Sequence, residues 1–117
     1  MKSAFRHGKA FKRMERGKYE SAARLLESVC NEVPEHTNSE YTYYNIGECY
    51  FRMGKLDTAL IWLSKSHDQY SNHIDSNKDV RYLRAYRDML QLYCKALRIN
   101  HQNELADKIS LGNDFGS

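Results

Sequence analysis

Hydrophobic residues recur along this chain at spacings of three and four positions, and no stretch alternates strictly between apolar and polar residues. The spacing is clearest in one set that falls on a single helical stripe: Leu83, Tyr86, Leu90, Tyr93 and Leu97. Glycine and proline, which weaken helix interiors, number only six and one. The pattern therefore predicts an all-α fold.

Five short segments interrupt the helical pattern and indicate where helices end. They are Gly17, residues 34–39, Gly54, residues 71–78 and the region around His101. The stretches between these breaks predict about six helices, at residues 3–16, 18–33, 39–53, 56–71, 79–99 and 102–111.

Local signals support three of these boundaries. Pro34 lacks an amide hydrogen and disfavours helical backbone at the residue before it, so the second helix should end there. Thr37 with Glu40, and Ser76 with Asp79, have the hydroxyl-then-carboxylate spacing of a capping box. We expect these two pairs to start the third and fifth helices.

A short segment of the chain is repeated. Residues 17–22 read Gly-Lys-Tyr-Glu-Ser-Ala, and residues 54–59 read Gly-Lys-Leu-Asp-Thr-Ala. A fainter third copy ends at Ala106 and has His101 where the other two have glycine. Such self-similarity predicts stacked copies of one helical pair.

Residues 40–73 resemble a tetratricopeptide repeat (TPR), a unit of about 34 residues that forms two antiparallel helices. The matching positions are Tyr43, Ile46, Gly47, Tyr50, Gly54, Leu56, Ala59, Leu63 and Ser66. The resemblance implies that Gly47 and Ala59 allow the two helices to approach closely, while the bulky residues fill the space around them.

The resemblance extends over residues 1–117 as one domain, with a first repeat at about 3–36, a second at about 40–73, a degenerate third pair or cap at about 79–111, and a frayed tail at 112–117. The first repeat matches mainly in its second half. In its first helix Ala10 fits the small position, and Gly8 is the alternative if that helix is longer. In the third pair, Cys94 and Ala106 take the small positions.

The TPR resemblance also implies a concave groove, lined by the first helix of each pair, in which a partner polypeptide docks. In this register the partner-binding residues are His7, Phe11 and Met14, then Tyr41, Tyr44, Asn45, Glu48, Phe51 and Arg52, and finally Gln91 and Lys95. Three of the aromatic residues, Tyr41, Tyr44 and Phe51, are more than the core of their helix needs. Aromatic residues dominate interface hot spots, so these three suit recognition of a partner. The alternative is that a tightly wrapped array buries them.

Basic residues are concentrated at the start of the chain, where residues 1–18 hold seven Lys and Arg residues against the single Glu15. One charged stripe is predicted, with members three or four positions apart: Lys2, Arg6, Lys9, Arg13 and Arg16. The stripe is either a solvated outer face or a contact for an acidic protein surface. Nucleic acid is a less favoured partner, because the net charge of the whole chain is only +3.

The sequence contains no motif for catalysis, metal binding or cofactor binding. Glycine-rich phosphate loops and nucleophile elbows are missing, and the five histidines form no ligand pattern. The three cysteines are far apart and odd in number, which predicts free thiols. We therefore expect no enzymatic activity and no cofactor.

The longest uninterrupted apolar run, residues 59–63, is far shorter than the roughly 20 residues of a membrane span. The charged start of the chain also lacks the apolar stretch of a signal peptide, so we expect a cytoplasmic protein that does not enter a membrane. The leading hypothesis is a protein–protein interaction module. A bacterial immunity or antitoxin-like inhibitor that caps a toxin is the alternative, and nucleic-acid binding through the basic helix is a third.

Overall fold

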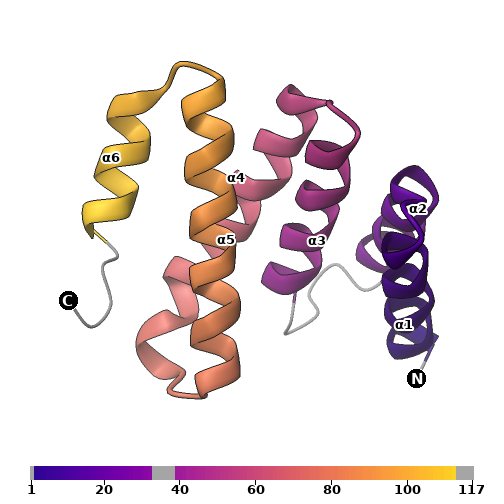
Figure 1. Cartoon of the computed structure of the whole chain (residues 1–117). Coiled ribbons are helices and arrows are strands. Elements are labelled where there is room, and N and C mark those ends of the chain that lie inside the picture. Colours follow the sequence, from indigo (N-terminus) through magenta and orange to yellow (C-terminus); the bar gives the residue numbers. More distant parts are fainter. Residues whose placement is uncertain (1, 33–38, 113–117) are drawn as a thin grey trace.

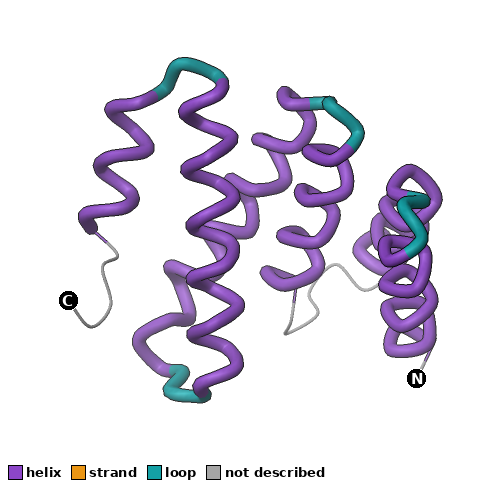
Figure 2. Tube along the Cα trace, in the orientation of Figure 1, coloured by secondary structure: helices purple, strands orange, loops and turns teal. Residues whose placement is uncertain are grey.

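The computed structural model describes residues 2–32 and 39–112. These residues form six α-helices and one short 3-10 helix (Figure 1), namely α1 (Lys2–Glu15), α2 (Tyr19–Glu32), α3 (Ser39–Arg52), α4 (Leu56–His73), η1 (Ile74–Ser76), α5 (Val80–Ile99) and α6 (Asn103–Gly112). Within the described ranges the chain contains no strand (Figure 2). The predicted all-α fold of about six helices is confirmed. Pro34, Thr37 and residues 113–117 of the predicted tail lie outside the described residues.

The helices pack as three consecutive hairpins, α1 with α2, α3 with α4 and α5 with α6. Neighbouring hairpins meet where α2 contacts α3 and where α4 contacts α5, and α3 also contacts α5. The hairpins therefore follow one another in a row (Figure 1). This order places the first helices of the hairpins, α1, α3 and α5, along one side of the array.

The turn inside each hairpin has the same backbone conformation. Gly17, Gly54 and His101 all have positive φ, at 75°, 77° and 63°. In each turn the amide of the following residue donates to a carbonyl five positions earlier: Lys18 to Arg13 at 2.8 Å, Lys55 to Tyr50 at 2.9 Å and Gln102 to Leu97 at 2.8 Å. This arrangement satisfies carbonyls at the end of the first helix of each hairpin. The faint third copy of the repeated segment, at His101, therefore forms the same turn as the other two copies.

Small residues lie where the two helices of a hairpin are closest. A Cβ atom built on Gly47 would lie 2.8 Å from the Cγ atom of Leu63 and 3.4 Å from the carbonyl oxygen of Ala59. In the third hairpin, the Cys94 thiol donates to the Ala106 carbonyl at 3.6 Å. Both hairpins therefore use the predicted small positions for close packing.

In the first hairpin, the small position of α1 is Ala10. Ala10 is fully buried, whereas Gly8 is exposed and a Cβ atom built on it would meet nothing within 4 Å. The alternative register with Gly8 as the small residue is therefore wrong. The physical reason is that the Cβ position of Gly8 faces open space, so no neighbouring side chain restricts the size of this residue.

The connection between α4 and α5 differs from the sequence prediction. Helix α4 continues to His73, and Ser76 lies in η1, where its hydroxyl donates to the His73 carbonyl at 3.1 Å. Asp79 caps α5 alone, by accepting a hydrogen bond from the Arg81 amide at 2.7 Å. The predicted capping box of Ser76 and Asp79 is therefore wrong, because the helix begins at Val80 and Ser76 belongs to the preceding turn.

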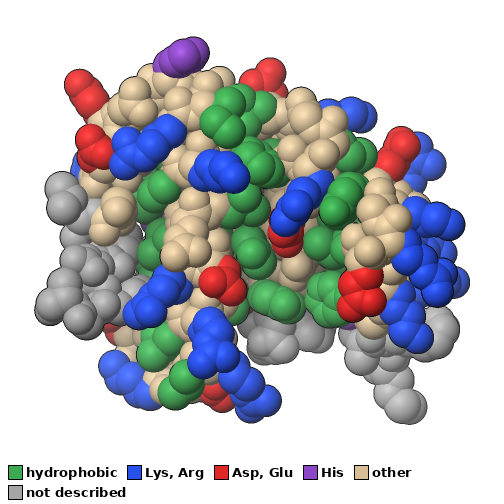
Figure 3. Space-filling model, viewed as in Figure 1, with side chains coloured by type: hydrophobic (Ala, Val, Ile, Leu, Met, Phe, Trp, Pro, Cys, Tyr) green, Lys and Arg blue, Asp and Glu red, His purple; other side chains and the backbone are tan. Residues whose placement is uncertain are grey.

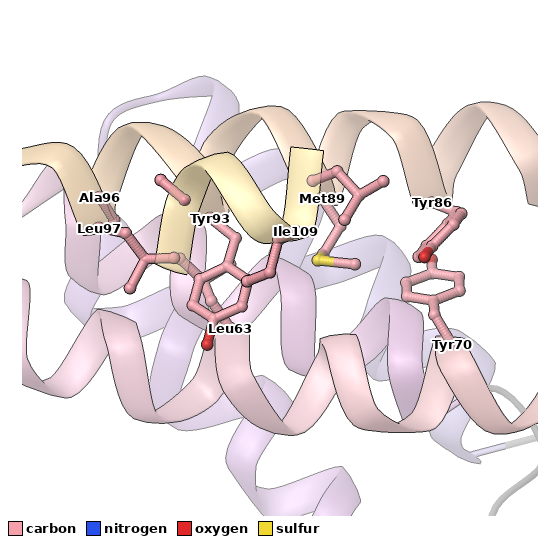
Figure 4. Packing of buried hydrophobic residues seen from close by; sticks show 10 residues of the cluster. Leu63, Tyr70, Tyr86, Met89, Tyr93, Ala96, Leu97 and Ile109 are labelled. Atoms are coloured by element: carbon pink, nitrogen blue, oxygen red, sulfur yellow. The ribbon is translucent and has the colours of Figure 1, made fainter. Parts of the chain in front are cut away.

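The buried side chains form two clusters. The larger joins α4, α5 and α6, and Figure 4 shows side chains of α5 pointing toward Leu63 and Tyr70 of α4. The smaller joins α1, α2 and α3 around Ala10, Leu26 and Ile46. On the predicted stripe of α5, Leu83 is half-buried and the other four residues are buried. This helix therefore supplies most of the core that covers the second hairpin.

Candidate partner-binding groove

A groove of about 1180 Å³ lies between the first helices of the three hairpins. Its walls come from α1, α3 and the N-terminal half of α5, with Tyr70 of α4 at the base. Figure 3 shows hydrophobic side chains on both sides of α3, toward α5 and toward α1. The predicted groove residues that line it are His7, Phe11, Tyr41, Tyr44, Asn45 and Glu48.

Aromatic rings form a continuous row from α1 to α3 along this groove. The ring centroids of His7 and Phe11 are 6.2 Å apart, those of Phe11 and Tyr41 are 6.1 Å apart, and those of Tyr41 and Tyr44 are 6.2 Å apart. Tyr41 is 41% exposed, whereas the other three side chains are half-buried. The row therefore presents one open ring that is supported by neighbours on both helices.

Polar contacts hold the wall behind these rings. The Nε2 atom of His7 is hydrogen-bonded to the Thr42 hydroxyl at 2.7 Å, which ties α1 to α3. The side-chain amide of Asn45 donates to the Tyr41 carbonyl at 2.9 Å, and Asn45 is buried. Asn45 thus positions the wall of the groove through a contact within α3.

Glu40 carries a buried carboxylate at one end of the groove. One of its oxygens, Oε2, accepts a hydrogen bond from the Tyr82 hydroxyl at 2.8 Å and lies 3.1 Å from Nδ1 of His73. The other oxygen, Oε1, is buried without a hydrogen-bond partner among the described residues. The Glu40 carbonyl accepts from the Ser66 hydroxyl at 2.7 Å, which ties α3 to α4.

Burial and negative charge act together on the tyrosines of the groove. The pKa of Tyr44 is raised by burial and then by the nearby carboxylates of Glu48 and Asp88. The pKa of Tyr82 is raised by burial and by its hydrogen bond to Glu40. Both shifts indicate a site that disfavours added negative charge.

The remaining predicted partner-binding residues do not line this groove. Met14 packs against the smaller core cluster, and Phe51 packs against the larger one. The Lys95 ammonium lies 5.7 Å from the Phe51 ring centroid, and Arg52 pairs with Glu48 at 3.3 Å. Gln91 is exposed on α5. These residues continue along the same helices, toward the ends that carry the hairpin turns.

The predicted basic stripe on α1 divides between two environments. Arg6 and Arg13 are half-buried, and they donate to the hydroxyls of Ser28 at 3.5 Å and Ser21 at 2.7 Å on α2. Lys9 and Arg16 are exposed. The side chain of Lys2 lies outside the described set. Two of the stripe residues therefore also connect the helices of the first hairpin.

Sequence reasoning missed several residues of the groove. Glu40 was interpreted only as part of a cap, while Tyr70 and Tyr82 belonged to no predicted site. The one available signal was the surplus of tyrosines, nine in the whole chain. Their convergence with Glu40 depends on contacts between residues up to 42 positions apart.

The three cysteines are free, as predicted, with Cys49 buried and Cys30 and Cys94 half-buried. Burial is the largest cause that raises the pKa of each thiol, so these groups are held protonated within the packed helices. None of the helices within residues 2–32 and 39–112 has the length and apolar character needed to span a membrane.

Comparison with known proteins identifies one family. A family model described as a domain of unknown function (DUF6340) matches residues 8–97, about three quarters of the chain. Searches of curated proteins and of solved structures found no match. The matched region begins within α1 and ends near the end of α5, and it includes every groove-lining residue except His7. The chain therefore belongs to the DUF6340 family.

Proposed function

We propose that this chain is a TPR-like interaction module that binds a partner polypeptide in the groove between α1, α3 and α5 and performs no chemistry. The observation that carries the proposal is the aromatic row of this groove, in which the ring of Tyr41 is exposed. Aromatic rings supply large contact areas at little cost in side-chain entropy, and they are enriched among the residues that dominate binding energy.

The packing of the row supports this proposal. Phe11 and Tyr44 are half-buried, and Tyr44 also packs against the larger core cluster. A partner would thus meet rings whose positions are already restrained, which lowers the entropy cost of binding. Because Tyr41 is the most exposed ring of the row, its loss should affect binding more than folding.

The TPR-like character of the module is supported by repeated details. The three hairpin turns share one backbone conformation, and buried alanines stand at equivalent places in the second helices: Ala22, Ala59 and Ala106. In proteins built from such hairpins, the first helices present an extended concave surface for binding. The position of the groove agrees with that arrangement.

Partner capture followed by titration tests the proposed function. The partner is cross-linked to the wild-type protein in its source cell, identified by mass spectrometry and titrated against purified variants. Tyr41→Ala should weaken binding by about 1 to 4 kcal/mol. Ile61→Ala is the matched control, because Ile61 is 57% exposed on α4 and lies outside the groove.

The proposal would be contradicted if Tyr41→Ala folds and binds the captured partner as tightly as the wild type does. The identity of the captured protein separates the two hypotheses from the sequence. A toxin whose activity is blocked would establish an immunity or antitoxin-like inhibitor, and a partner that remains active would establish an adaptor.

A cytoplasmic location is part of the same proposal. Free thiols persist in reducing compartments, and all three cysteines of this chain are free. Fractionation of the source cell, with the protein detected by an antibody, tests the location directly.

A further inference from the structure

Glu40 holds one carboxylate oxygen that nothing within the described residues satisfies. The residue is only 3% exposed, and it lines the groove. Its Oε2 atom is held by Tyr82 and His73, whereas Oε1 has no donor in the part of the chain that the structure describes. A buried carboxylate oxygen without a donor is unfavourable, because it has lost its water and gained no hydrogen bond in return.

The groove around Glu40 is suited to a positive charge. Four tyrosines share the lining with Glu40: Tyr41, Tyr44, Tyr70 and Tyr82. The faces of such rings attract ammonium and guanidinium groups. A cation in the groove would therefore meet aromatic faces and a carboxylate in the same place.

The charged residues of the groove lead to the same conclusion. Four carboxylates line it, from Glu40, Glu48, Asp79 and Asp88, against the two guanidinium groups of Arg81 and Arg84. Asp79 contacts Arg81 at 3.6 Å, and Glu48 is paired with Arg52 from outside the lining. Asp88 has no ion-pair partner among the residues described. Arg84 also has no ion-pair partner among the described residues, but the lining still holds more carboxylates than guanidinium groups. The groove is thus negative overall, although the chain as a whole is basic.

We infer that Glu40 and the surrounding tyrosines bind a cationic side chain, arginine or lysine, of the partner polypeptide. The inference rests on the proposed function, since it names the chemistry of the partner in the same groove. The bound cation donates a hydrogen bond to Oε1 of Glu40 and packs on the tyrosine rings. Because Oε1 is buried in the partner-free structure, a side chain beside it has to move when the cation binds. We assign this movement to Tyr82, which is half-buried, lines the groove and contacts Glu40 through Oε2.

Selection from a library of short random peptides tests this inference. Peptides that bind the wild type but not Tyr41→Ala are groove binders, and we expect them to share an arginine or lysine at one position. Replacing that residue by its neutral analogue, citrulline or norleucine, should weaken binding to the wild type by at least about tenfold. The same replacement should change binding to Glu40→Gln by less than about twofold.

Asp88→Asn is the matched control, because it removes another groove carboxylate and leaves Glu40 in place. This variant should still discriminate against the neutral peptide. If Glu40→Gln does not fold, nuclear magnetic resonance spectra of the wild type with each peptide test the inference instead. The cationic peptide should then shift the ring resonances of Tyr82, and the neutral peptide should not.

Two results would overturn the inference, and they differ in what they say about the proposed function. Groove binders that lack a cation, or that tolerate the neutral analogue, overturn the inference and leave the proposed function standing. A library that yields no peptide dependent on Tyr41 overturns both.

Discussion

At the scale of single residues, His101 shows how strongly the hairpin turn is determined by the fold. It is the one non-glycine residue with positive φ in the described part of the chain. The other two turns place Gly17 and Gly54 at this point, because a Cβ atom strains the left-handed backbone. The third hairpin therefore carries a strained turn that the first two avoid.

We predict that His101→Gly stabilises the protein. Relief of the left-handed strain exceeds the extra entropy that glycine adds to the unfolded chain, so the free energy of unfolding should rise by about 0.5 to 1 kcal/mol. Urea denaturation measures the change. Gly54→Ala is the reverse control and should destabilise the protein by a similar amount, since Gly54 has the same conformation and its Cβ position is otherwise open. A destabilised His101→Gly would indicate that the imidazole makes a contact that outweighs the strain.

At the scale of elements, the small positions decide how closely the two helices of a hairpin approach. Ala59 is fully buried against α3, where its carbonyl oxygen lies beneath Gly47. Leu63, one turn further along α4, occupies the space that a side chain on Gly47 would need. The hairpin of α3 and α4 therefore has no room for a larger residue at either position.

We predict that Ala59→Leu overpacks this hairpin and lowers the free energy of unfolding by about 1 to 3 kcal/mol. Gly47→Leu should have at least the same effect, because its Cβ atom would already lie 2.8 Å from Leu63. Gly8→Ala is the control. No atom lies within 4 Å of its added methyl group, so the gain in helix propensity should stabilise the protein by about 0.5 to 1 kcal/mol. Thermal unfolding followed by circular dichroism distinguishes the three variants, and an unchanged midpoint for Ala59→Leu would contradict the repeat register.

At the scale of the whole molecule, the third hairpin covers the second. The larger core cluster takes only two of its ten buried members, Leu63 and Tyr70, from α4, and the other eight come from α5 and α6. A helical hairpin cannot bury both of its faces alone, and the third hairpin shields the apolar side of the second from water. We therefore propose that α5 and α6 act as a cap on the second hairpin, and the first helix of this cap also forms a wall of the groove.

We predict that a chain truncated after Lys78 loses its cooperative structure. Removing α5 and α6 would expose Leu63 and Tyr70 together with the half-buried Leu60, which should produce an aggregating or molten chain. Light scattering after gel filtration, dye binding and near-ultraviolet circular dichroism measure the effect. A truncated chain that stays monomeric, helical and cooperative would contradict the cap, and the binding site would then be sought on the removed hairpin.

The sequence by itself determined the helices and their order. Helix formation and turn chemistry depend on neighbours three to five positions away, which the spacing of apolar residues and Gly17 and Gly54 reveal directly. The repeated hexapeptide likewise predicted the equivalent small positions, and the buried Ala22 and Ala59 agree with it. The sequence predicted that the fourth helix ends at residue 71, whereas α4 continues to His73. His73 contacts Glu40 on α3, and this contact is not local in sequence.

The tertiary structure alone decided the chemistry of the groove. Glu40 had a local explanation as a cap, and only packing against α4 and α5 buries its carboxylate beside His73 and Tyr82. It also selected which predicted aromatics line the groove, retaining Tyr41 and Tyr44 and packing Phe51 elsewhere against the core. The physical reason is that periodicity assigns a residue to a face of its helix, whereas burial and unpaired charge depend on what the neighbouring helices place opposite that face.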